Sequence, residues 1–183
     1  KKIDMQNLGA YIVTRIYGFS EDDALKVRKA YCQVVIGKYD SAVAVIDKNS
    51  MGKKEPVNVY LKAVAYEHKG DHLRALQHYH FTIVADNTIA EAYKKRGIYR
   101  QELKEWQNSV DDLTTYLKFY PDTWLINKIR GVSYYHLNRF PEAISDYTKY
   151  LKYDTANNEV RGYRGMAYLK ANQPLSAYLD FAA

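Results

Sequence analysis

The chain has 183 residues, a formal net charge of +6 and one cysteine, Cys32. A single cysteine excludes an internal disulfide framework and a paired-cysteine zinc site. No apolar run approaches the length of about 18 residues that a membrane-spanning helix needs, so no span is predicted. Basic and acidic residues are interspersed, which favours a solvated surface over a nucleic-acid-binding one.

Apolar residues recur at helical spacing along the whole chain. Ser20 is expected to cap a helix, because its hydroxyl precedes three carboxylates that the helix dipole favours in a first turn. Pro56 is expected in the first turn of another helix, and Cys32 is expected to be a small core residue. The predicted helices cover residues 4–17, 21–36, 39–49, 56–69, 72–85, 90–103, 106–119, 124–137, 140–153 and 158–171, with a last one from Pro174.

Small and large side chains alternate with a period of 34 residues. If each unit is numbered from 1, positions 8 and 20 hold only small residues and position 24 holds large ones. Position 8 is Ala30, Ala63, Gly97, Gly131 and Gly165, and position 24 is Ile46, Tyr79, Leu113, Tyr147 and Phe181. Two closely packed helices need small residues where their axes approach and large ones beside them. A period of 34 is typical of a helix–turn–helix array.

This register resembles the tetratricopeptide repeat, most closely from Gly131 to Leu151. The resemblance implies an all-α fold, a right-handed α-solenoid superhelix in which each unit packs on its neighbours. It predicts an N-terminal helix and cap over residues 1–22 and about five repeats over residues 23–183. The expected repeats are 23–55, 56–89, 90–123, 124–157 and 158–183, with the last one cut short.

Position 7 is basic in all five units, as a rail of phosphate contacts would be. Position 23 is aspartate in each of the three units that have arginine at position 7. Arginine can hold a carboxylate with two hydrogen bonds, so we expect structural ion pairs, each contributing about 0–1 kcal/mol if exposed. The expected pairs are Arg96–Asp112, Arg130–Asp146 and Arg164–Asp180. Nucleic acid is therefore not the expected partner.

The resemblance also implies that the first helices of successive units line a concave groove. Position 9 of the groove is apolar and never asparagine, unlike the family members that clamp a C-terminal carboxylate. The predicted groove residues are Tyr60, Val64, His68, Lys94, Ile98, Gln101, Lys128, Val132, Tyr135, His136, Met166 and Leu169. An exposed apolar strip usually marks an interaction site, and an amphipathic helix or extended segment of a partner would suit it. The alternative is that the chain's own first helix or a neighbouring copy covers the strip.

No catalytic motif stands out in the sequence. His68, His72, His78 and His80 are close in sequence, but a turn or helix geometry separates them, so no metal site is expected. No cofactor is expected either. The sequence thus predicts a non-catalytic adaptor or scaffold that binds a protein or peptide, with a self-assembling scaffold as the alternative and RNA binding less favoured. The cytoplasm is the default location, and a targeting segment or anchor outside this sequence stays open.

Overall fold

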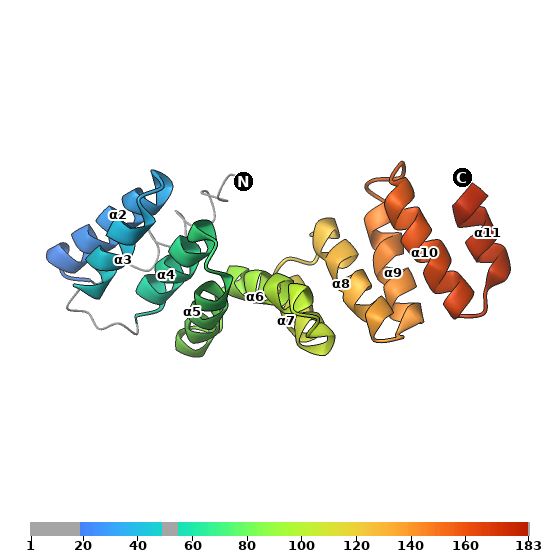
Figure 1. Ribbon diagram of the computed structural model, residues 1–183, viewed down its shortest axis with the longest axis horizontal. Coiled ribbons are helices and arrows are strands. Elements are labelled where there is room, and N and C mark those ends of the chain that lie inside the picture. The colour runs from blue at the N-terminus through green and yellow to red at the C-terminus, as the bar shows by residue number, and fades with distance from the viewer. Residues whose placement is uncertain (1–18, 49–54, 183) are drawn as a thin grey trace. The chain divides into compact units, whose positions relative to one another are not determined.

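The computed structural model describes residues 19–48 and 55–182, and in these residues the regular structure is helical (Figure 1). The helix expected over residues 4–17 lies outside the described residues. The described helices are α2 (Glu21–Val35), α3 (Tyr39–Asp47), α4 (Pro56–Lys69), α5 (His72–Ala85), α6 (Ala90–Glu102), α7 (Trp106–Phe119), α8 (Trp124–His136), α9 (Phe140–Leu151), α10 (Asn158–Lys170) and α11 (Pro174–Ala182). The all-α prediction is confirmed, and each predicted helix that falls in this part is present to within a turn.

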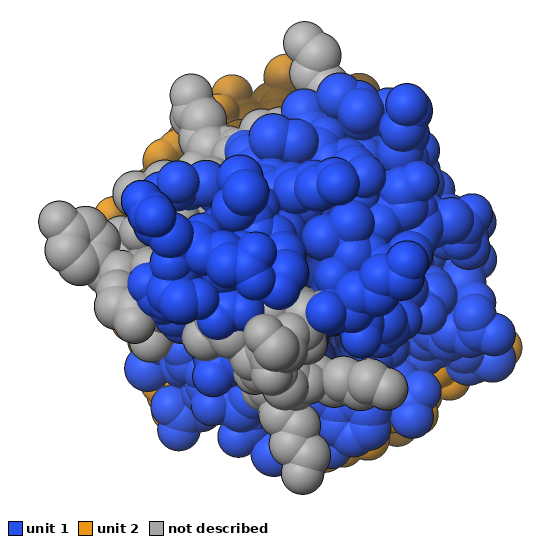
Figure 2. All heavy atoms as spheres, turned by 90° about the vertical axis from the view of Figure 1, so that its left-hand side faces the viewer, with its two compact units in different colours: residues 1–92 blue, residues 93–183 orange. Residues whose placement is uncertain are grey.

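The chain forms two compact units, residues 1–92 and 93–183 (Figure 2). In the first unit α2 packs on α3, both contact α4, and α4 packs on α5. In the second unit α7 packs on α8, α8 on α9, α9 on α10 and α10 on α11. Within each unit these helices therefore contact their neighbours in sequence, in consecutive pairs.

The predicted helix starts are also confirmed. The Ser20 hydroxyl accepts a hydrogen bond from the Asp23 backbone N–H at 3.2 Å, and Pro56 lies in the first turn of α4. Asp71 caps α5 in the same way, accepting from the Arg74 backbone N–H at 3.2 Å. Each cap satisfies a backbone donor that has no partner inside its own helix.

Close helix packing explains the small residues at position 8. A methyl group added at Gly131 would lie 2.8 Å from Cε1 of Tyr147, and one added at Gly165 would lie 2.5 Å from Cε1 of Phe181. At Gly97 the nearest atoms, on Leu113, would be 3.0 Å away. In each case the large residue at position 24 of the unit, which lies on the second helix, occupies the space that a side chain at position 8 would need.

One core assignment was wrong. Cys32 is exposed, because α2 buries the face that carries Ala24, Val27, Ala30 and Val34, and Cys32 lies on another side of the helix. Among the described helices none combines the length and apolar character that crossing a membrane requires.

Candidate functional site

Three arginines on first helices hold three aspartates on the second helices of the same pairs. Nε and Nη2 of Arg130 donate to the two carboxylate oxygens of Asp146, both at 2.8 Å. The same two-point geometry occurs in the other two pairs, at 2.7–2.8 Å and 2.5–2.8 Å. We call them the Arg–Asp staples: Arg96–Asp112, Arg130–Asp146 and Arg164–Asp180. Their carboxylate side chains are 4%, 2% and 8% exposed, so the staples are buried rather than surface ion pairs.

The staples also reach the preceding helix pair. Nη1 of Arg130 donates to the Thr114 hydroxyl at 2.9 Å, and Nη1 of Arg164 donates to the Thr148 hydroxyl at 3.1 Å. In the first unit Lys62 stands at the equivalent position and pairs with Asp47 of the preceding helix pair. Position 7 thus ties each of these pairs to the one before it.

Burial of Arg130 and its pairing with Asp146 shift the pKa of the Arg130 guanidinium in opposite directions. Desolvation lowers its pKa, but the hydrogen bonds and the charge of Asp146 together outweigh that penalty, so the pKa is raised. In the preceding pair Asp112 receives a third donor, because Nη1 of Arg100 lies 2.8 Å from it. The guanidinium groups of these arginines therefore already donate to carboxylates within the helix array.

The predicted groove residues of the first unit are largely buried. Val64 is only 5% exposed and Tyr60 only 4%, so the apolar strip does not face solvent on α4 as expected. The cause is that α4 buries nine consecutive residues, from Val57 to Ala65, instead of a single face. His68 stacks on Tyr39 of α3, with ring centroids 5.6 Å apart.

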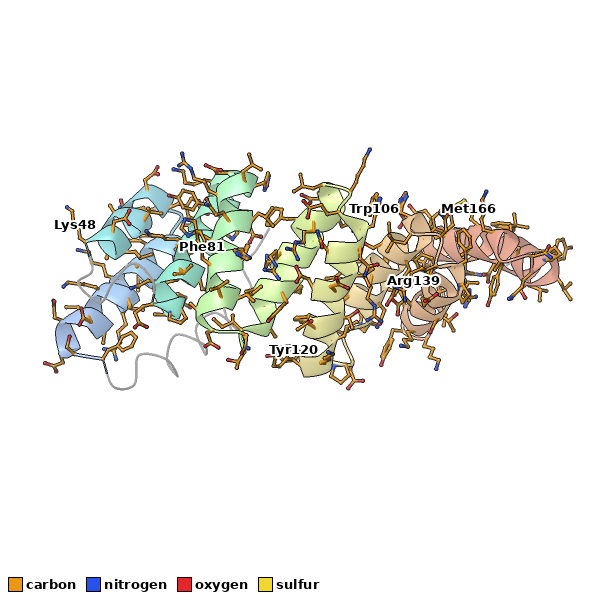
Figure 3. All side chains as sticks on the ribbon, turned by 90° about the horizontal axis from the view of Figure 1, so that it is seen from below. Lys48, Phe81, Trp106, Tyr120, Arg139 and Met166 are labelled. Carbon is orange, nitrogen blue, oxygen red and sulfur yellow. The ribbon has the colours of Figure 1, made fainter. Side chains whose placement is uncertain are left out.

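The remaining predicted groove residues lie in the second unit, and we call the surface they form the first-helix face. It consists of Lys94, Ile98 and Gln101 of α6, Lys128, Val132, Tyr135 and His136 of α8, and Met166 and Leu169 of α10. Ile98 and Val132 are half-buried, whereas Met166 (labelled in Figure 3) and Leu169 are 40% and 53% exposed. The apolar strip is therefore most accessible on α10.

Polar contacts join the three helices of this face. Nε2 of Gln101 donates to the Ile129 carbonyl at 2.6 Å and to the Ser133 hydroxyl at 2.9 Å, which ties α6 to α8. Nζ of Lys128 donates to Glu159 at 2.8 Å, which ties α8 to α10. This hydrogen bond raises the pKa of Lys128 and lowers that of Glu159. Gln101 and Lys128 are thus engaged within the array.

Aromatic stacking fixes the end of α8. The His136 ring stacks on Trp106 of α7 with centroids 4.1 Å apart and planes 9° apart, and Tyr135 meets Phe140 edge-on at 5.6 Å.

Among the described residues no three histidine, cysteine, aspartate or glutamate side chains are grouped as a metal site requires.

No protein-family model and no curated protein matches the sequence. Solved structures do match. A crystal structure of MamA protein aligns with a TM-score of 0.75 over 88% of this chain and 89% of its own, at 19% identity. MamA 41-end from Desulfovibrio magneticus RS-1 aligns with a TM-score of 0.73 over 90% and 94%, at 14% identity, and MamA AMB-1 reaches 0.76 at 16% identity over 87% and 95%. MamA is a tetratricopeptide-repeat protein.

The chain has the tetratricopeptide-repeat fold. In this fold the side chains that pack against a neighbouring repeat are buried, and the remaining side chains form the surface that faces solvent. On the last described helix, α11, Leu175 and Leu179 are 72% and 61% exposed, with Tyr178 between them also exposed. The exposed large apolar side chains of the second unit thus include Met166 and Leu169 on α10 and Leu175, Tyr178 and Leu179 on α11.

The sequence analysis missed several contacts between repeats. Trp106 stacks on His136 as Tyr39 stacks on His68, and in both cases position 17 of one repeat meets position 13 of the next. The sequence signal that could have predicted these contacts is an aromatic residue at position 17 of one repeat with histidine at position 13 of the next. The hydrogen bond from Lys128 to Glu159 was likewise not predicted.

Proposed function

We propose that the chain is a non-catalytic protein-binding module whose first-helix face holds an apolar segment of a partner protein. The exposure of Met166 and Leu169 carries this proposal, because two large apolar side chains on one helix face lie open to solvent. Half-buried Ile98 and Val132 continue the same strip on α6 and α8. A fold shared with MamA supports a module of this type.

The partner segment best suited to this face has apolar anchors at helical or alternating spacing. Lys94 and Lys128 flank the strip, and acidic residues beside the anchors would match them. Since Lys128 already pairs with Glu159, apolar contact rather than charge is expected to supply most of the affinity.

The exposed pair offers the sharpest test. Met166→Lys combined with Leu169→Lys places two charges on the strip without entering the core, so folding should be retained. Because charged groups desolvate poorly against an apolar partner, capture of partner proteins from a lysate, read by mass spectrometry, should fall at least about tenfold.

The matched control is Leu73→Lys, on the second helix α5, where an equally apolar side chain is 73% exposed. It should leave capture unchanged. Equal capture by all three forms would show that the first-helix face is not the binding surface.

The exposed face of α11 favours a second candidate, a self-assembling scaffold. Leu175, Tyr178 and Leu179 form an apolar surface that another copy could cover. Leu175→Lys combined with Leu179→Lys should then reduce the mass measured by light scattering to that of a monomer. A monomeric mass for the natural chain at high concentration contradicts this candidate.

A role in nucleic-acid binding is less favoured than protein binding, because the arginines of the staples already hold carboxylates. Binding of RNA with affinity that falls steeply as salt rises would contradict this preference.

A further inference from the structure

The first helices of later repeats share one side, which packs on the preceding helix pair. In α8 the hydroxyl of Ser133, at position 10, donates to that of Ser109 on α7 at 3.2 Å. In α10 Val160, at position 3, belongs to the same core cluster as residues of α9. Position 7 reaches the preceding pair as well, because Arg164 donates to the Thr148 hydroxyl of α9. Positions 3, 7 and 10 therefore face the preceding repeat.

Positions 3 and 10 are buried where a described helix pair precedes them in the same unit. The residues at position 3 are at most 2% exposed, and those at position 10 are 0% exposed. They are Asn58 and Ala65 of α4, Ile126 and Ser133 of α8, and Val160 and Ala167 of α10. Burial at these two positions thus marks an occupied contact between repeats.

The same side of α2 is open to solvent. Leu25, at position 3, is 62% exposed, Cys32, at position 10, is exposed, and Val35, at position 13, is 45% exposed. Arg28 and Lys29, at positions 6 and 7, are exposed as well. Spacings of three, four and seven residues place these five side chains on one side of the helix. We call them the α2 face, and α3 and α4 pack on the buried side of α2 (Figure 1).

A contact inside the chain shows which chemistry suits this face. In α4 Lys62, at position 7, pairs with Asp47, which lies at position 25 of the preceding repeat. The Lys62 side chain is only 10% exposed there, so its charge needs that carboxylate. Lys29 carries the same ammonium group at position 7 of α2, with Arg28 beside it. A helix docked on the α2 face would therefore need a carboxylate opposite Lys29.

Neither the last described helix nor the N-terminal segment supplies a well-matched carboxylate. On α11 position 25 is Ala182, and the one carboxylate, Asp180, is already held in a staple. Residues 1–17 contain three basic residues but one acidic residue, Asp4, so like charges oppose their docking here. Charge complementarity therefore favours a helix of another protein over a second copy or the chain's own N-terminal segment.

An anionic membrane suits the α2 face less well than a helix does. Glu21 and Asp22 are exposed in the first turn of α2, and their spacing from Leu25 places them on the same side of the helix. A membrane surface that is negative throughout would meet these carboxylates as well as the basic residues. A helix can instead present a carboxylate to Lys29 alone.

We propose that the α2 face is a second interaction surface, which binds an amphipathic helix of a partner protein as α4, α8 and α10 contact the helix pair before them. The partner helix places a carboxylate opposite Lys29 and apolar side chains against Leu25 and Val35. Cys32 is small, like the alanine and serine at position 10 of α4, α8 and α10, and this lets a helix approach closely. The α2 face is separate from the first-helix face, whose residues lie in the second unit.

The single cysteine of the chain lies in this face, so docking on the full chain can be measured by disulfide trapping. The probes are amphipathic helical peptides about 18 residues long. Each has a cysteine at the equivalent of position 20, where Ser109 faces Ser133, and a variable residue at the equivalent of position 25, where Asp47 faces Lys62. The peptides are supplied as mixed disulfides with 2-mercaptoethanol. The Cys32 thiolate displaces 2-mercaptoethanol, and the yield at equilibrium reports the non-covalent affinity.

The variable residue is glutamate, glutamine or lysine. The glutamate peptide should be trapped about three to five times as well as the glutamine peptide, which is the gain from one ion pair, and the lysine peptide should be trapped least. Lys29→Gln should remove this order, whereas Lys118→Gln, the same change at an exposed position of α7, should preserve it. Equal trapping of the three peptides by the natural chain would overturn the proposal.

Leu25→Lys separates docking from simple attraction of charges. The added positive charge would raise trapping of the glutamate peptide by attraction alone, whereas loss of a buried apolar contact should lower it about tenfold. Leu73→Lys, the same change at an exposed position of α5, should leave trapping unchanged. Circular dichroism melting checks that each variant folds. Increased trapping by Leu25→Lys contradicts the proposal.

Other occupants of the α2 face give different results, and each would overturn the proposal. A mass by light scattering that falls to that of a monomer in Leu25→Lys would assign the face to a second copy. Binding to phosphatidylserine-containing vesicles that Lys29→Gln abolishes would assign it to a membrane. Increased trapping by a chain with Leu8→Lys and Ile12→Lys would assign it to residues 1–17.

The first-helix face can fail independently of the α2 face. Met166→Lys combined with Leu169→Lys changes only α10, so it should leave peptide trapping at Cys32 unchanged. A loss of trapping in that variant would show that the peptides bind elsewhere, which contradicts the proposal.

Discussion

At the scale of the residue, one backbone position shows how each helix pair turns. Five residues in the described chain have positive φ, and each follows the first helix of its pair at position 15. They are Gly37, Gly70, Lys104, Asn138 and Asn172. In all five, the residue and its successor donate to carbonyls of the preceding turn, for example Lys104 to Gln101 and Glu105 to Arg100. This is the left-handed helix end that glycine and asparagine favour.

Lys104 has a φ of 61° and is the one described residue of this set with a long side chain. The left-handed conformation costs a residue with a Cβ about 1–2 kcal/mol, partly offset by the greater freedom that glycine has in the unfolded chain. Lys104→Gly should therefore raise the free energy of unfolding by about 0.5–1 kcal/mol in urea denaturation. Lys104→Ala removes the same charge but keeps the Cβ, and an equal gain from it would contradict this explanation.

At the scale of the element, the approach of two helices depends on position 8. Gly131 lies against the ring of Tyr147, which is 1% exposed. Gly162 lies in α10 with nothing within 4 Å of the place where a Cβ would be. The two glycines thus occupy similar helical backbones but opposite packing environments.

Alanine at these two positions should have effects of opposite sign. In Gly162→Ala the gain in helix propensity, about 1 kcal/mol, should appear as added stability. In Gly131→Ala the same gain is opposed by overpacking of about 1–3 kcal/mol, so we expect a net loss of about 1 kcal/mol. Chemical denaturation of both variants measures the difference, and stabilisation by both would show that Tyr147 can move aside.

The helix pairs were predictable from sequence because their packing is local. Gly131 and Tyr147 are sixteen residues apart, in consecutive helices, and a repeated small-and-large pattern specifies their contact. Contacts between successive helix pairs were less predictable, because they depend on the rotation of one pair relative to the next. The repeat period of the sequence does not specify that rotation. Gln101 was therefore expected to line a groove, but its amide bridges α6 and α8.

At the scale of the whole molecule, contacts between sequence neighbours imply that a local defect stays local. In the second unit α8 packs on α7 and α9, and α9 packs on α10. Arrays of this kind are approximately a sum of repeat stabilities and nearest-neighbour terms. The Arg–Asp staples are the buried polar links in this series, which makes them a means of weakening one chosen pair.

Asp146→Asn should destabilise the α8–α9 pair most. The amide keeps the shape of the carboxylate but removes its charge, so the Arg130 guanidinium, with 11% of its side chain exposed, loses its counter-ion. Breaking a buried pair on one side typically costs about 3–5 kcal/mol, well above the 0–1 kcal/mol expected for an exposed pair. Hydrogen exchange should show the largest loss of protection in α8 and α9, a smaller loss in α7 and α10, and none in α2 to α4.

Asp180→Asn is the matched control, because it makes the same chemical change in the α10–α11 pair. Its loss of protection should centre on α10 and α11, with α7 unaffected. If either variant lowers protection equally from α2 to α11, the chain opens as one cooperative structure and the nearest-neighbour description is wrong. If the loss of protection is instead similar in size but centred on a different helix pair in each variant, each staple stabilises its own pair. The stability of the array is then distributed along the chain repeat by repeat.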